Sequence, residues 1–370
     1  SGPQRLPGTP TTELTNTLSG PFNNMGVPGA KSFHLAFPGY AALNPYYGRM
    51  ATSASATVIG DAVSQSPTFF SLWIGNNDVL AYATNGGDGV NQLGNLNPAT
   101  YGNNDITDPN VFASVYSGLL DQLTANGAKG AVANIPYVTS IPYFTTVPYN
   151  PVPLDAPTAG LLNGAYAAYN NGLLFAAGNG LISSDEVSRR TITFQAGAGN
   201  AVVIEDEYLT NLSSFGIPSY RQATAEDLVI LPASTFIGTV VGGNPQLING
   251  LSVPLADRWV LTKNEIQEVK VAVDAYNASI QSLASAKGLA FVDANALLNQ
   301  IATTGIQSDG FILRGNLVFG NAFSLDGVHP TSRGYAFIAN KFIEAVNATY
   351  GSNLPKVNIG NYNNLYPAQM

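Results

Sequence analysis

The sequence has no cysteine and only two histidines, and each shortage excludes a class of site. Without cysteine the chain can form no disulfide, no thiolate metal site and no cysteine nucleophile. With His34 and His329 alone, a histidine-rich zinc site is not expected, and we expect no metal and no cofactor. No apolar run reaches the roughly 18 residues that suggest a membrane span, so none is predicted.

Charge is also scarce. Charged residues make up 10% of the 370 residues, against about 25% in an average soluble domain. Hydrophobic residues make up 45%, so uncharged polar side chains must cover much of the surface, which is common in secreted proteins. The N-terminus shows no signal peptide. The net charge is −8 and no run of Lys or Arg occurs, so nucleic acid is not an expected partner.

Apolar strand patterns alternate with amphipathic helix patterns, which indicates an α/β fold. Residues 66–74 (SPTFFSLWI) form a short apolar run that ends at Gly75, and residues 130–135 (GAVANI) form a second. Between them, Asp108-Pro109 is a helix-start signal, since Asp caps a helix and Pro suits its first position. A helix is therefore predicted from there to about Ala125.

The same alternation returns near the C-terminus. Thr262-x-x-Glu265 is a capping box and predicts a long amphipathic helix that ends near Gly288. A buried strand over 289–293 and a last helix over 331–350 follow. Four side chains of that last helix are predicted to face inward, namely Tyr335, Ile338, Phe342 and Val346.

Residues 136–260 differ in character and are interpreted as an insertion that forms a lid or cap. Three Pro-Tyr dipeptides interrupt its first part, a helix is expected within 158–177, and strand-like pieces follow at 191–194 and 201–204. The predicted organisation is an N-terminal part of the α/β domain over 1–135, the insertion over 136–260, a C-terminal part over 261–350 and a tail over 351–370.

The strongest chemical signal is Asp326-Gly-Val-His329-Pro330, directly before the last helix. A carboxylate three residues ahead of a histidine can accept the Nδ1–H bond of the imidazole and leave Nε2 free as a base. Pro330 suits a helix start, because its missing N–H would have no partner there anyway. The plainer interpretation is a turn in which the Asp caps the helix and the His is a bystander.

Two weaker signals lie earlier in the chain. Gly75-Asn76-Asn77-Asp78 follows a predicted strand, at the edge where ligands bind in open α/β sheets, and an Asn amide there can donate to an oxyanion. In Asn24-x-Gly-x-x-Gly29 the glycines let the backbone approach a ligand and offer an N–H as a second donor. Taken alone, each motif is as well explained as an ordinary turn.

Together and in this order, the three motifs resemble the SGNH/GDSL hydrolases, which are serine esterases. Asn-x-Gly-x-x-Gly, Gly-x-Asn-Asp and Asp-x-x-His-Pro are similar to the second, third and fifth blocks of that family, and the likeness covers about residues 20–135 and 260–350. It implies a flavodoxin-like three-layer α/β/α sandwich that hydrolyses esters without a cofactor. The residues within these motifs are most similar to those of secreted or lipoprotein esterases of Bacteroidetes-type bacteria. This likeness implies a secreted, periplasmic or outer-surface location.

The resemblance also assigns roles. His329 is the expected general base and Asp326 its orienting partner, while the Gly29 N–H and the Asn77 side chain form the expected oxyanion hole. The expected substrate is a small-molecule ester or an acylated carbohydrate.

One block of the family is absent. The nucleophile serine belongs to a Gly-Asp-Ser or Gly-Asn-Ser motif after the first strand, and this sequence has no such motif. Ser1 and Ser19 lack a preceding strand, and Ser32 and Ser140 are better explained as loop serines. We therefore expect an upstream segment with the motif, or a lost nucleophile. In the second case the chain would be a glycan- or lipid-binding protein that keeps the fold.

Three further features are His34, a group of aromatic residues and an acidic segment. His34 is expected to have a structural role early in a helix. The aromatic residues Tyr137, Tyr143, Phe144 and Tyr149 line either an acyl or sugar site or a packed lid. Residues 205–207 (Glu-Asp-Glu) are expected to form a solvated turn, with calcium binding as a remote alternative.

Overall fold

The computed structural model describes residues 13–362, which divide into two compact units. Unit 1 comprises residues 1–81, 90–140 and 269–370, and unit 2 comprises residues 82–89 and 141–268. Ser1, the start of the N-terminal loop and the end of the 351–370 tail lie outside the described residues. No helix among those described is long and apolar enough to cross a membrane.

Unit 1 is built on a parallel three-stranded sheet. Its strands are β1 (Phe69–Leu72), β2 (Lys129–Ala133) and β11 (Ala290–Val292), in the order β1-β2-β11. β2 is paired on both sides, with β1 and with β11. Parallel neighbours need crossover connections, and helices supply them. β1 and β11 lie inside predicted apolar runs and β2 begins one residue before its run, so the mixture of helices and strands agrees with the α/β class.

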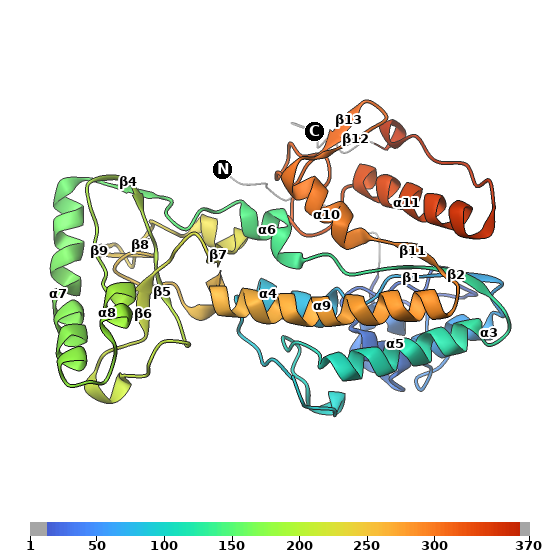
Figure 1. The fold of residues 1–370 in the computed structure, drawn as a ribbon, viewed down its shortest axis with the longest axis horizontal. Coiled ribbons are helices and arrows are strands. Elements are labelled where there is room, and N and C mark those ends of the chain that lie inside the picture. The colour runs from blue at the N-terminus through green and yellow to red at the C-terminus, as the bar shows by residue number, and fades with distance from the viewer. Residues whose placement is uncertain (1–12, 363–370) are drawn as a thin grey trace. The chain divides into compact units, whose positions relative to one another are not determined.

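Helices cover both faces of this sheet (Figure 1). On one face α11 (Ser332–Tyr350) packs through Val346 and Phe342 against Ala131 and Ala290. On the other lie α5 (Pro109–Thr124) and α9 (Lys263–Ala286), whose rings Phe112 and Tyr276 stack at 4.3 Å between centroids. Each of these helices begins at the predicted place.

The caps explain these starts. Asp108 accepts hydrogen bonds from the N–H groups of Asn110 and Val111, and Thr331 accepts one from Gly334. Glu265 accepts from the N–H and the hydroxyl of Thr262, which is half of the predicted capping box.

The remaining helices of unit 1 are α1 (Tyr40–Leu43), α2 (Pro45–Gly48), α3 (Val58–Ser64) and α10 (Ala294–Thr303), and β12 (Ile306–Ser308) pairs with β13 (Phe311–Leu313) in a hairpin. Helix α4 (Asn77–Thr84) begins in unit 1.

Unit 2 combines helices with short antiparallel strand pairs. Its helices are α6 (Pro142–Thr145), α7 (Ala156–Gly178) and α8 (Ser184–Arg190). The pairs are β3 (Val152–Leu154) with β4 (Gly197–Asn200), β5 (Val203–Glu205) with β6 (Tyr220–Gln222), β7 (Leu228–Val229) with β10 (Val260–Leu261), and β8 (Val240–Val241) with β9 (Asn244–Ile248). The expected helix within 158–177 is confirmed.

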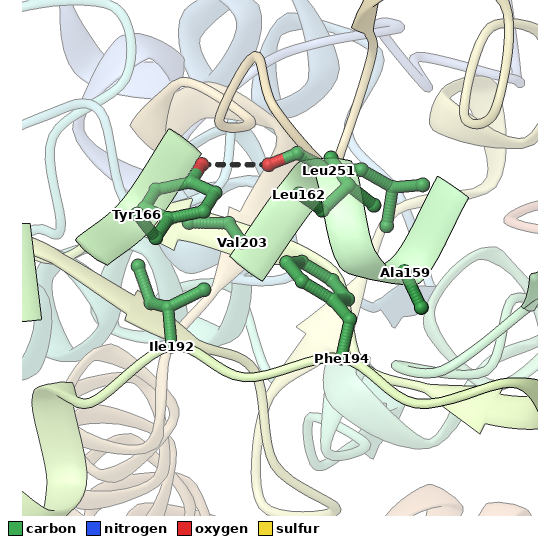
Figure 2. Close-up of a cluster of buried hydrophobic side chains, with 7 residues drawn as sticks. All are labelled: Ala159, Leu162, Tyr166, Ile192, Phe194, Val203 and Leu251. Atoms are coloured by element: carbon green, nitrogen blue, oxygen red, sulfur yellow. Dashed lines mark hydrogen bonds between the residues drawn. The ribbon is translucent and has the colours of Figure 1, made fainter. Parts of the chain in front are cut away.

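The core of unit 2 forms beneath α7, as Figure 2 shows. Leu162 and Tyr166 of the helix pack on Ile192, Phe194 and further apolar side chains, all buried. The Tyr166 hydroxyl donates to the Leu251 carbonyl at 2.6 Å, so its polar end is satisfied inside the core.

Two expectations were wrong, and the start of a third element was displaced by two residues. Residues 191–194 form no strand, because the N–H groups of Ile192 and Phe194 donate to side chains of α7, Asn170 and Asn163, and not to a strand partner. The strand expected at 201–204 is β5, which begins two residues later, at Val203. Tyr335 is 51% exposed and does not face inward.

Candidate functional site

A tight turn carries Asp326 and His329. The Ser324 N–H donates to the His329 carbonyl at 2.8 Å, and Phe323 and Pro330 pair as an antiparallel bridge. Gly327 lies at the turn with φ +73°, a conformation that suits glycine. These backbone bonds close the turn and bring the side chains of Asp326 and His329 next to each other.

The predicted hydrogen bond within this turn is present. His329 Nδ1 lies 2.7 Å from Asp326 Oδ2. Asp326 Oδ1 accepts from the Ser324 hydroxyl at 2.6 Å, the Val328 N–H at 2.8 Å and the His329 N–H at 3.0 Å. The carboxylate is therefore fixed on both oxygens, and the ring orientation follows from it.

These bonds keep Asp326 ionised. Partial burial opposes ionisation, but the hydrogen bonds from Ser324, Val328 and His329 outweigh it and lower the pKa of Asp326 to about 2. The His329 side chain is 66% exposed and that of Asp326 49% exposed, so the pair faces solvent and not the core. This geometry suits a base held by a carboxylate, and the catalytic role itself stays a prediction.

The structure brings the two expected oxyanion donors together. The Asn77 side chain, at the start of α4, donates to the carbonyl of Ala30, the residue after Gly29, at 2.9 Å. Gly29 itself is exposed, with φ +76°. This bond uses one of the two Asn77 amide hydrogens, and the oxyanion role of Asn77 and Gly29 stays a prediction.

The glycine before Asn77 has a steric reason. Gly75 has φ +120°, and a Cβ there would lie 2.4 Å from Ile135 and 2.8 Å from Phe112. Only glycine can turn the chain from β1 into α4 against those side chains.

A buried polar cluster supports this corner, and the sequence motifs did not predict it. Asp78 is fully buried and accepts from the N–H and the hydroxyl of Ser32, at 2.8 and 2.7 Å. Lys31 is buried beside it and donates to the Asp105 carbonyl at 2.7 Å. Ser32 is therefore a buried residue at the start of the 3-10 helix Ser32–Ala36 and not the loop serine that was expected. The available signal was Asp78, the charged residue that ends the Gly75-Asn76-Asn77-Asp78 motif.

The two halves of the site are not linked by hydrogen bonds. Gly29 and Asn77 form one group and Asp326 and His329 another, and among residues 13–362 no hydrogen bond joins them. Their convergence on one reacting atom stays a prediction. Ser140 ends a short 3-10 turn, Val138–Ser140, consistent with a loop serine.

The carboxyl end of the sheet carries further polar side chains that sequence reasoning missed. Asn134 follows β2 and donates to Asp293, which follows β11, at 2.8 Å. The Asn134 side chain also accepts from the Asn295 N–H at 2.9 Å. These groups satisfy one another and join the ends of two strands. The sequence predictions had placed Asn134 and Asp293 inside the strands expected at 130–135 and 289–293, whereas β2 and β11 end one residue before them.

The other candidates have structural surroundings. His34 Nδ1 accepts from the Lys31 N–H and its ring stacks on Tyr40 at 4.5 Å. Burial, with the charge of Lys31, lowers the pKa of His34 to about 4, so the ring is neutral at neutral pH. It lies in the 3-10 helix Ser32–Ala36, which confirms the expected structural role.

The structure also gives contacts for some residues of the aromatic loop (Tyr137 to Tyr149) and of the acidic turn (205–207). Phe144 is fully buried and Tyr137 donates its hydroxyl to Asp274. Asp206 is not solvated, because it is buried and bonded to Arg221 at 2.5 Å. Across the described part of the chain, no group of three acidic or histidine side chains is arranged to hold a metal ion.

Comparisons of the chain with known protein families, with curated proteins and with solved structures found no match.

Proposed function

We propose that this chain is a serine-type ester hydrolase of the SGNH/GDSL kind, with a flavodoxin-like α/β/α arrangement in unit 1. The observation that carries the proposal is the turn at Asp326 and His329. A carboxylate with a pKa of about 2 holds Nδ1 of a solvent-facing imidazole, and Nε2 is left as a base.

The residues would share the work of acyl transfer. His329 would take the proton from the attacking hydroxyl and later give it to the leaving alcohol, while Asp326 stabilises the imidazolium formed between these steps. The Asn77 amide and the Gly29 N–H would donate to the oxyanion of the tetrahedral intermediate. Each donor comes from the loop of a different motif, and the Asn77–Ala30 bond holds the two loops together.

The proposed reaction also needs a hydroxyl group that attacks the ester. The 370 residues contain no Gly-Asp-Ser or Gly-Asn-Ser motif, and Ser32 is buried with its hydroxyl bonded to Asp78. The exposed acid–base pair nevertheless favours hydrolysis over simple binding, because binding alone needs no such pair. The proposed substrates are small esters or acylated carbohydrates, and the proposed location is outside the cytoplasm of a bacterium.

The competing proposal is a glycan- or lipid-binding protein that has kept the fold. The missing motif favours it.

Hydrolysis of p-nitrophenyl acetate separates the two. We propose to compare the protein with its His329→Ala variant. An esterase gives turnover that is lost when His329 is replaced by alanine. Without an attacking serine, an intact oxyanion hole leaves a rate of only about 10³–10⁴ over water. A protein that hydrolyses no ester and binds a glycan or a lipid would overturn the esterase proposal.

A further inference from the structure

Unit 2 carries an aromatic groove that the proposed esterase mechanism does not use. The groove has a volume of about 560 Å³ and lies between α7 and the segment from Phe215 to Tyr220. Pockets of about 300–1,000 Å³ with apolar and aromatic walls are typical of small-molecule sites. Five rings line it, those of Tyr166, Tyr169, Phe175, Phe215 and Tyr220.

Small residues on α7 make the space. Ala165, Ala168 and Gly172 lie on one face of the helix, at steps of three and four, and line the floor of the groove. A Cβ at Gly172 would come within 3.2 Å of Ile217 on the opposite wall. Larger side chains at these positions would close the groove.

The polar ends of the tyrosines point away from it. The Tyr166 hydroxyl donates to the Leu251 carbonyl in the core (Figure 2). The Tyr169 hydroxyl donates to the Tyr220 carbonyl and accepts from Arg190. Two of the three tyrosines therefore offer ring carbon and not hydroxyl to a ligand.

The groove is also free of charge. None of the described residues that line it is ionisable as an acid or a base at neutral pH, and α7 has no charged residue over 23 positions. Arg190, which bonds Tyr169, is completely buried and paired with Glu186 at 3.1 Å. An anionic or cationic ligand would find no counter-charge here, and a sugar would find few hydrogen-bonding groups beyond the Asn171 amide.

The rim is apolar as well. Phe175 and Phe215 are 62% and 54% exposed, and Leu174, beside Phe175, is 62% exposed. A cluster of exposed apolar side chains at a groove is typical of a binding site.

We propose that this groove binds an unbranched alkyl chain, such as the acyl tail of a lipid or a lipidated molecule. Ring faces and alanine methyls would cover the methylene groups, and a polar head would stay in solvent outside the rim. The proposal goes beyond the esterase function and does not depend on it, because binding needs neither His329 nor a nucleophile.

Alkyl maltosides test this, used as monomers below their aggregation concentration and measured by calorimetry on the 370-residue chain. Each buried methylene strengthens binding about fourfold, so dodecyl maltoside, with two more methylenes, should bind about fifteenfold more tightly than decyl maltoside. Maltose alone should not bind. Equal affinities for the two chain lengths, or binding of maltose alone, would overturn the proposal in favour of a sugar site.

A matched pair of variants locates the site. Ala168 lines the groove and the neighbouring Ala167 does not, although both are exposed on α7. Ala168→Trp should weaken dodecyl maltoside binding at least about tenfold, and Ala167→Trp should leave it unchanged. If Ala168→Trp unfolds the protein, Phe215→Ser with Leu161→Ser as its control replaces the pair.

Two results would contradict the assignment. Equal loss in the groove variant and its control would place the ligand elsewhere. No alkyl binding, together with a dimer in sedimentation that Ala168→Trp disrupts, would make the groove an interface between two copies of this chain.

Discussion

At the scale of single residues, the site rests on how Asp326 is held. One oxygen accepts three hydrogen bonds and the other meets His329 Nδ1. The two residues are three apart, so local backbone bonds build the pair and the sequence alone could predict it. Lys31 and Ser32 are different, because their partners lie 46 to 74 residues away and nothing in their local sequence points to them.

Asp326→Asn tests the orienting role. An amide at this position can offer its NH₂ to Nδ1 and favour the wrong imidazole tautomer, so kcat/KM for ester hydrolysis should fall by about 10⁴-fold. The tautomer itself can be read from the ¹⁵N shifts of His329. Asp121→Asn, which removes an exposed partner of Lys287, is the control and should change neither quantity. An unchanged tautomer with unchanged kcat/KM in Asp326→Asn would contradict the role.

At the scale of elements, the apolar runs and the caps predicted the sheet and its covering helices. They failed at 191–194, where Thr-Ile-Thr-Phe has a strand composition but Asn163 and Asn170 of α7 take the backbone N–H groups. The strand propensity of a segment does not show that distant side chains will accept its backbone N–H groups. The order β1-β2-β11 also needed the structure, since the sequence shows strands and not their neighbours.

Helix α8 provides a test of burial at this scale. Arg190 is completely buried and bonds Glu186, the carbonyls of Thr210 and Pro218, and Tyr169. Arg190→Met removes the positively charged partner of the Glu186 carboxylate, which keeps only its bonds from Thr210, and should lower the free energy of unfolding by about 3–5 kcal/mol in urea titrations. The neighbouring Arg189 is exposed, and Arg189→Met should change it by less than about 0.5 kcal/mol. Equal effects would show that Arg190 is not held as described.

The start of α9 predicts a dependence on pH. Burial raises the pKa of Glu265 to about 8, with the charges of Asp257 and Glu207 adding to it and the bonds from Thr262 opposing it. Burial, with Glu207 and Asp88, raises the pKa of Asp257 to about 7. One oxygen of each carboxyl is buried without a partner in the described structure. Both groups therefore hold protons in the folded chain at pH values where the unfolded chain, with pKa values near 4, has lost them.

Stability should therefore be full below about pH 4 for these two groups and decline as pH rises to 7–8. The urea midpoint should fall between pH 6 and pH 9. Glu265→Gln should flatten this decline, because an amide does not titrate. Glu226→Gln alters an exposed partner of Lys263 near the same helix start, and its profile should match the wild type. A steep decline that survives in Glu265→Gln would contradict the assignment.

At the scale of the whole molecule, the chain divides differently from the sequence prediction. The insertion was expected at 136–260, whereas unit 2 spans 141–268 and includes residues 82–89. Tyr82 donates its hydroxyl to Glu268, and a Cβ on Gly87 would overlap Glu265, so this short piece packs on the start of α9. The contact spans more than 170 positions of sequence, and composition and periodicity carry no sign of it.

The two histidines allow the most direct test of the esterase proposal. His34 is a structural residue and His329 is the proposed base, so His329→Ala and His34→Ala compare the two imidazoles that the chain contains. The quantity to measure is kcat/KM of the protein for p-nitrophenyl acetate, with folding of each variant checked by circular dichroism. We predict that His329→Ala lowers it by about 10³-fold or more, while His34→Ala keeps it within about tenfold of the wild type. Full activity in His329→Ala would contradict the account.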